Sequence, residues 1–136
     1  MARLFTLQEA EELLPEVERW LRAAIECRKN LSALDDQMRA LLERVNVSGG
    51  VQVDVEAAAR MKSGRQQAIE RLQQSLADIE QTGVLVKDLD IGLIDFPTLL
   101  DGSEVYLCWK LGEPHIGFWH HTTEGYKERK SIDRDF

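Results

Sequence analysis

Apolar residues recur every seven positions between residues 17 and 45, and this repeat constrains the fold more than any other feature of the chain. One position of the repeat is occupied by Val17, Ala24, Leu31, Met38 and Val45. The companion position, three residues later, is occupied by Trp20, Cys27, Leu34 and Leu41. This spacing places both sets on one face of an α-helix and is typical of helices that pair along an apolar seam. The sequence therefore predicts a long helix packed against another helix.

A second apolar stripe follows a break at residues 47–53, where two adjacent glycines predict a turn. Asp54 is suited to cap the helix that follows. The stripe of that helix consists of Val55, Ala58, Ile69, Leu72, Leu76 and Ile79. Gly83 comes directly after it and suits a left-handed C-cap. Residues 1–83 are therefore predicted to form an antiparallel helical hairpin.

The start of the hairpin carries a capping signal and a proline. Thr6 and Glu9 have the spacing of a capping box, which predicts a helix start at this point. Proline inside a helix removes a hydrogen bond and clashes with the preceding turn, whereas at a first helical position it costs little. We therefore expect a break or kink at Leu13–Leu14 and a second helix that begins at Pro15.

Beyond Gly83 the sequence has the features of a sheet. Residues 84–97 are rich in β-branched side chains and predict one or two strands, with a turn near 87–90. Asp101-Gly102 is a second turn signal. The fold class is therefore α+β: a long, coiled-coil-like antiparallel helical hairpin followed by a small antiparallel β-sheet. We expect one domain over 1–136, with a β-rich part and a polar tail in 84–136.

Residues 105–121 predict a β-hairpin that turns at Gly112-Glu113. This turn would pair Lys110 with His115, Trp109 with Ile116 and Cys108 with Gly117. Because side chains alternate along a strand, two faces result. The core face would carry Val105, Leu107, Trp109, Ile116 and Phe118. The other face would carry Tyr106, Cys108, Lys110, His115, Gly117 and Trp119.

The second face is typical of a small-molecule pocket, although it also fits a plain outer surface covered by a helix. Asp95 lies in an apolar strand, where a carboxylate is costly unless it has a partner. It either faces the pocket or caps the strand before Phe96-Pro97. The candidate ligand-binding residues are Asp95, Cys108, Glu113, His115, Trp119, His120 and Arg129. The identity of the small-molecule ligand is unknown.

The same region holds atom types that bind Zn²⁺ or Fe²⁺, but their spacing matches no established motif. These atoms belong to Asp95, Cys108, Glu113, His115, His120 and His121. On a strand, adjacent His120 and His121 point to opposite faces and cannot share one site. Cys108, between two large apolar residues, fits packing better than nucleophilic catalysis. The sequence therefore predicts no resident metal or other cofactor, with zinc as the alternative.

The charge of the chain limits its partners. The formal net charge is −7, whereas a protein that binds phosphate backbones needs a basic surface. Nucleic acid and anionic membranes are thus disfavoured as partners. No apolar run approaches the ~20 residues of a membrane span. Cys27 and Cys108 lie far apart in different kinds of segment, which favours a reducing cytoplasm over a disulfide.

Several strings carry a family resemblance: Phe5-Thr-Leu-Gln-Glu-Ala-Glu-Glu-Leu-Leu-Pro15, Val86-Lys-Asp, Gly92-Leu-Ile-Asp-Phe-Pro97, Val105-Tyr-Leu-Cys-Trp-Lys-Leu-Gly-Glu-Pro114, Phe118-Trp-His120, and Glu124-Gly-Tyr with Arg129. Through them, nearly the whole chain resembles a family of small bacterial proteins, domain-of-unknown-function family 2203. The resemblance implies no defined activity. Its matching residues form a polar-aromatic set in this chain: Asp95, Cys108, Trp109, Glu113, Trp119, His120, Glu124 and Arg129.

We favour a non-enzymatic binding or scaffold protein that forms a homodimer through its helical hairpin and offers a small pocket on its sheet. Two helices alone cannot cover both apolar stripes, and a second copy would complete a four-helix arrangement. The alternative is a small hydrolase, with or without a metal, that uses Asp95, Glu113, His115 or His120.

Overall fold

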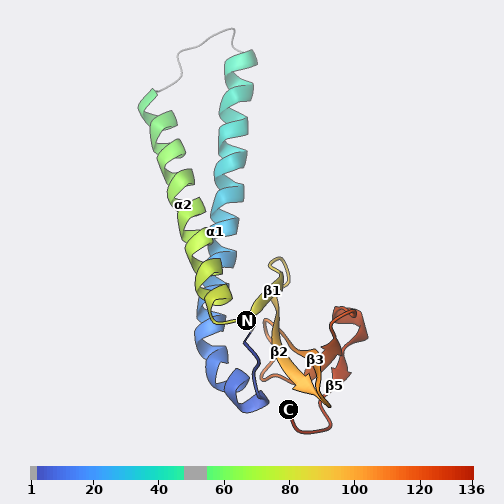
Figure 1. Cartoon of the computed structure of the whole chain (residues 1–136). Helices are drawn as coiled ribbons and strands as arrows, with labels where there is room; N and C mark the ends of the chain where they lie inside the picture. The colour runs from blue at the N-terminus through green and yellow to red at the C-terminus, as the bar shows by residue number, and fades with distance from the viewer. Residues whose placement is uncertain (1–2, 48–54) are drawn as a thin grey trace.

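A computed structural model describes residues 3–47 and 55–136 and confirms the α+β class. The predicted turn between the helices and the Asp54 cap lie outside the described residues. The helices are α1 (Leu7–Val47), α2 (Val55–Gln81) and the short 3₁₀ helix η1 (Tyr126–Glu128). The strands are β1 (Leu85–Asp88), β2 (Leu93–Leu100), β3 (Ser103–Lys110), β4 (Phe118–His121) and β5 (Lys130–Ser131). Figure 1 shows the two long helices side by side, with the sheet beside their lower part.

The predicted caps of the hairpin are confirmed. Glu9 N–H donates to Thr6 Oγ1 at 3.1 Å, and Thr6 N–H donates to Glu9 Oε1 at 3.0 Å. This reciprocal pair satisfies two amides that the first turn of a helix leaves without partners. At the C-terminal end of α2, Gly83 has a φ of 98°, as a left-handed C-cap requires. No helix in the described parts of the chain combines the length and apolar character of a membrane span.

The predicted break at Leu13–Leu14 is wrong, because α1 runs through Pro15 without interruption. Ala10 and Val17 have 0% exposed surface and Leu14 has 7%, so the helix is held on the core before and after the proline. The Pro15 ring lies on the solvent side. Burial on both sides of the proline therefore outweighs the ~3 kcal/mol that an interior proline costs a helix.

The apolar side chains of α1 are fully buried at the base of the hairpin and only half buried further out. At the base, Val17, Leu21 and Ala24 have no exposed surface. We call residues 25–44 of α1 and 55–67 of α2 the distal half; none of its described side chains is fully buried. Its half-buried seam residues in α1 are Cys27, Leu31, Leu34, Met38 and Leu41. Figure 1 shows the distal half extending well past the sheet.

The strands form one antiparallel sheet in the order β1-β2-β3-β4-β5. The turn between β1 and β2 spans 89–92, two residues later than the predicted 87–90. The predicted Asp101-Gly102 turn is confirmed and joins β2 to β3, with φ values of 51° and 80°. Two successive positive φ angles belong to the tight turn whose twist matches that of the flanking strands.

β3 and β4 pair one residue out of the predicted register. Cys108 lies opposite Phe118 rather than opposite Gly117. Because side chains alternate along a strand, a shift of one residue exchanges the two faces of β4. Trp119 therefore lies on the face that meets the helices, the inner face, and His120 lies on the opposite, outer face.

Residues 111–117 form a loop in place of the predicted tight turn, and two glutamates hold this loop. Lys110 N–H donates to Glu113 Oε1 at 2.7 Å. Ile116 N–H donates to Glu11 Oε1, from α1, at 2.9 Å. One amide at the end of β3 and one in the loop thus donate to carboxylate side chains, whereas Leu111 N–H and Glu113 N–H donate to main-chain carbonyls. The predicted pairs that do not form are Lys110 with His115 and Trp109 with Ile116.

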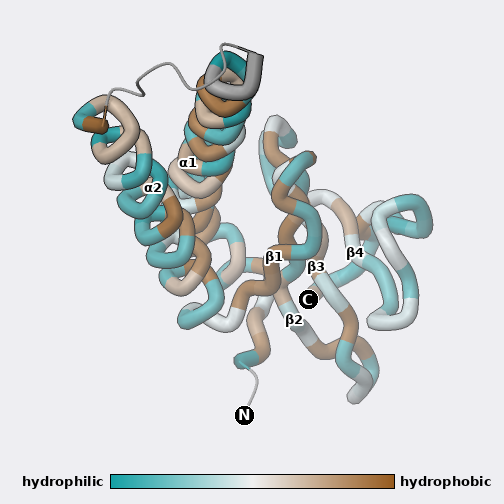
Figure 2. The backbone as a smooth tube through the Cα atoms, turned by 90° about the horizontal axis from the view of Figure 1, so that it is seen from above, coloured by the Kyte–Doolittle hydropathy of each residue, from teal (hydrophilic) through white to brown (hydrophobic). Residues whose placement is uncertain are grey.

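One hydrophobic core joins the hairpin base to the inner face of the sheet. Phe5 meets Phe96 edge-on, with ring centroids 5.4 Å apart. The helical side of the core, with the segment before α1, supplies Phe5, Ala10, Leu14, Val17, Leu21 and Ile79. The sheet side supplies Val84, Ile94, Phe96, Val105, Leu107, Trp109, Ile116 and Trp119. Figure 2 shows the same two layers from above, with the helices on one side and the sheet on the other.

Replacing Pro15 with alanine should stabilise the protein, because it restores a helical amide at an exposed position. We expect the free energy of unfolding to rise by about 2 kcal/mol, measured by urea denaturation. Glu26→Ala, at another exposed site on α1, should change it by less than about 0.5 kcal/mol. A loss of stability in Pro15→Ala would contradict the view that core packing merely tolerates the proline.

Substitutions at Gly92 and Gly102 distinguish the cost of a steric contact from the cost of backbone strain. Both glycines have positive φ, but only Gly92 has a close neighbour at the position of an added Cβ. A Cβ at Gly92 would lie 2.6 Å from Leu111 Cβ, whereas one at Gly102 would meet nothing within 4 Å. Gly102→Ala should cost about 1 kcal/mol of unfolding free energy through strain alone. Gly92→Ala should cost about 1–3 kcal/mol more through overpacking. Equal losses in parallel urea titrations would refute the importance of the Leu111 contact.

Candidate functional site

The outer face of the sheet carries a buried polar group at its centre. The side chains of this face are Asp95 and Pro97 from β2, Tyr106 and Cys108 from β3, and Phe118 and His120 from β4. Asp95 lies directly across from Cys108, and His120 lies across from Tyr106. The exposed fractions of Asp95, Cys108 and His120 are 1%, 0% and 3%. We call these three residues the polar triad.

The hydrogen bonds of His120 define where its protons lie. Nδ1 is 2.8 Å from the carbonyl oxygen of His121, which can only accept, so Nδ1 carries a hydrogen. Nε2 is 3.1 Å from both carboxylate oxygens of Asp95. A hydrogen bond there needs one further proton, either on Nε2 or on Asp95. Burial raises the pKa of the Asp95 carboxyl, with the nearby His120 opposing the shift.

Cys108 completes the triad as a neutral thiol. Burial, with a smaller contribution from Asp95, raises the pKa of the Cys108 thiol to about 12. The Arg129 guanidinium partly opposes this rise in the pKa of the thiol. Both nitrogens of His120 already have oxygen partners, so neither is directed at the sulfur. The arrangement therefore lacks the nucleophile–base contact of a cysteine hydrolase.

Arg129 connects the triad to the loop after β3. Its Nη1 lies 3.0 Å from Glu113 Oε1, and its side chain is 10% exposed. The guanidinium lies over the rings of Phe118 and Tyr126, at 4.1 and 4.2 Å from their centroids. Two ring faces and one carboxylate therefore fix its position.

Of the seven residues selected from the sequence, the structure brings five into one connected group. Asp95, Cys108 and His120 converge, and Arg129 links them to Glu113. The other two lie apart: Trp119 packs in the core on the inner face, and His115 is exposed in the loop 111–117.

The seven candidate residues do not include all the side chains that enclose the triad. The Tyr106 ring meets the His120 ring edge-on at 5.6 Å, and Lys87 Nζ lies 4.8 Å from the Tyr106 centroid. The predicted hairpin places Tyr106 on the same face as Cys108, which the structure confirms, although Tyr106 is not among the seven candidate residues. Phe118 could not have been found, because the predicted register placed it in the core.

One protein atom from each member of the polar triad lies within 4.8 Å of the other two. A thiol, an imidazole and a carboxylate are the donor types that zinc accepts. These are the residues that could hold a metal in the described part of the chain.

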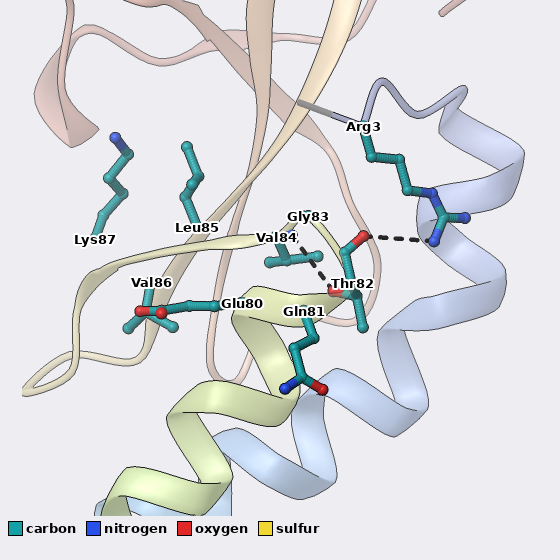
Figure 3. Close-up of a pocket in the computed structure, with 9 residues that line it drawn as sticks. All are labelled: Arg3, Glu80, Gln81, Thr82, Gly83, Val84, Leu85, Val86 and Lys87. Atoms are coloured by element: carbon teal, nitrogen blue, oxygen red, sulfur yellow. Dashed lines mark hydrogen bonds between the residues drawn. The ribbon is translucent and has the colours of Figure 1, made fainter. Parts of the chain in front are cut away.

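The chain also has a groove of about 560 Å³ where α2 meets β1. Figure 3 shows Arg3 at one end of it and Lys87 at the other, with the turn 80–84 between them. Arg3 donates to the Thr82 carbonyl at 3.4 Å. None of the seven candidate site residues lines this groove.

A helical hairpin packed on one face of a five-stranded antiparallel sheet, with a buried Asp-Cys-His group on the other face, defines the class of protein. The chain belongs to the family described as "Uncharacterized conserved protein (DUF2203)", whose model matches residues 3–132. This match confirms the family resemblance. Comparison with curated proteins finds no match, and comparison with solved structures finds none either.

The two cysteines should differ strongly in reactivity. With a pKa of about 12 in place of 9.0, the Cys108 thiol has about a thousandfold less thiolate near neutral pH. In native protein with a chelator present, we expect a thiol reagent to label half-buried Cys27 first. Cys108 should react at least about a thousandfold more slowly than in urea-unfolded protein, as peptide mass spectrometry would measure. Rapid native labelling of Cys108 would show that its environment is open.

Proposed function

We propose that this protein is a self-associating binding or scaffold protein, in which two copies pair through the distal halves of their hairpins. One observation carries the proposal: an apolar heptad pattern continues along a part of the hairpin that the sheet does not cover. The seam side chains of α1 are only half buried in this region, so apolar surface remains for a further partner to cover.

Two leucines on the same edge of α1 illustrate the contrast. Leu21 and Leu42 are separated by three heptads, so they occupy equivalent positions of the repeat. Leu21 is fully buried against the core, whereas Leu42 is 57% exposed. In α2, Val55 is 78% exposed. The core buries this edge of α1 at the base of the hairpin. A second copy that covers Leu42 would bury the same edge in the distal half.

Pairing of two hairpins gives a four-helix arrangement around a shared apolar seam, with coiled-coil-like packing. A two-fold axis would make the same surface of both copies self-complementary. Each fully buried leucine contributes about 1.5–3 kcal/mol, and the two-fold axis counts every contact twice. This gain supports a homodimer as the working unit.

The binding part of the proposal concerns the outer face of the sheet. The triad is too enclosed for a bulky ligand in this conformation, so the ligand is small or an ion. Both cysteines are free, which supports a reducing compartment such as the cytoplasm.

The second candidate function is a small hydrolase. The convergence of Asp95, Cys108 and His120 favours it, because buried ionisable groups in contact are frequent at active sites. The low exposure of all three residues weighs against it, since a substrate would have to reach them. We therefore favour the non-enzymatic function.

Light scattering coupled to size-exclusion chromatography tests self-association directly. At micromolar concentration we expect the mass of a dimer. Leu42→Glu should raise the dimer dissociation constant at least about a hundredfold, because each copy brings a charge to the seam. Leu99→Glu is the matched control, since Leu99 is 50% exposed on the sheet, and it should leave the dimer intact. A monomeric wild-type protein, or equal effects of the two variants, would refute the proposal.

A further inference from the structure

We propose that Asp95, Cys108 and His120 bind a divalent transition-metal ion of the zinc class. The three side chains come from neighbouring strands β2, β3 and β4, so a hydrogen-bonded sheet holds them in place. Ligands on such elements are positioned more accurately than ligands on loops. All three are buried, which distinguishes the group from the acidic clusters of protein surfaces.

The spacing of the ligand atoms fits a tetrahedral ion. With zinc bonds of about 2.0–2.3 Å, neighbouring ligand atoms lie about 3.5 Å apart. His120 Nε2 and the Asp95 oxygens are 3.1 Å apart, and all three ligand atoms lie within 4.8 Å of one another. Adjustments of about 1 Å therefore suffice, within the reach of side-chain rotation.

His120 is oriented as a metal ligand. Its Nδ1–H donates to the main-chain carbonyl of His121, which fixes the tautomer and directs Nε2 at Asp95. In protein metal sites, the second ring nitrogen of a histidine ligand usually donates to a carbonyl or carboxylate in this way. The ion would take the position between Nε2 and the Asp95 carboxylate where one proton now lies.

The charges balance with a divalent ion. A thiolate from Cys108 and the Asp95 carboxylate carry two negative charges, the neutral imidazole none, and the ion two positive charges. Binding displaces two protons, one from the thiol and one from the Asp95–His120 pair, and both go to solvent. The Arg129 cation beside the sulfur is already neutralised by Glu113, at 3.0 Å. A buried group of this composition therefore carries no net charge once the ion is bound.

Mixed sulfur, nitrogen and oxygen donors select among metals. Thiolate and imidazole favour Zn²⁺, Co²⁺ and Fe²⁺ over Mg²⁺ and Ca²⁺, which prefer oxygen alone. Three ligands converge within the described part of the chain, so the fourth tetrahedral position falls to water. This inference concerns the sheet and stands independently of self-association through the hairpin.

Cobalt titration tests the site, because Co²⁺ replaces Zn²⁺ and bonding to a thiolate gives it a near-ultraviolet charge-transfer band. Co²⁺ is added to the full-length protein both in its native state and during refolding from urea, since burial slows entry of the ion. We expect the band, one Co²⁺ per chain, and loss of the band when Zn²⁺ is added. Absence of the band after both procedures would overturn the proposal.

The chain offers a matched control, because it has only two cysteines. Cys108→Ser should abolish the band, and Cys27→Ser should retain it. Asp95→Asn and His120→Gln keep both thiols and should weaken Co²⁺ binding at least about a hundredfold. Circular dichroism verifies that each variant is folded. A band that depends on Cys27, or one that survives in both Asp95→Asn and His120→Gln, would overturn the proposal even if Cys108→Ser fails to fold.

Discussion

The structure depends on one contact, the burial of the sheet's inner face against the base of the helical hairpin. Trp109 and Phe96 have no exposed surface there, and Val17 and Leu21 meet the same core from α1. Neither part can bury its apolar surface alone: a meander has two bare faces, and a helix pair has bare outer edges. The contact explains why α1 passes through Pro15 without a break. It also explains why the hairpin loses its cover where the sheet ends.

Alternation then determines what the outer face can carry. Since Ile94, Leu107 and Trp119 occupy the inner face, their strand neighbours Asp95, Cys108 and His120 must face outward. Three polar groups thereby meet on adjacent strands, although they are far apart in the sequence. The tail that contains η1 and Arg129 crosses this side of the sheet and encloses them. The same alternation along the strands thus produces both the core on the inner face and the polar triad on the outer face.

Local signals in the sequence predicted much of this fold correctly. The heptad repeat, the Thr6–Glu9 box and the Asp101-Gly102 turn each depend on a few neighbouring residues, and all are confirmed. The errors arose where residues distant in the sequence determine the local structure. Pro15 is accommodated because of packing by a sheet about eighty residues later. The loop that replaces the predicted turn before β4 is held in part by Glu11, which no inspection of residues 105–121 would consider.

The bond from Ile116 to Glu11 has a consequence for the order of folding. It spans 105 positions of the sequence and holds the loop that precedes β4. A contact of this sequence separation is expected to form late, because a long stretch of chain must be ordered before its two ends meet. β1, β2 and β3, joined by short turns, can therefore assemble early, while the bonds of the loop before β4 are complete only after the first turns of α1 have docked. His120, one of the three members of the triad, lies on β4, so we expect its contact with Asp95 to form after β2 and β3 have brought Asp95 and Cys108 together.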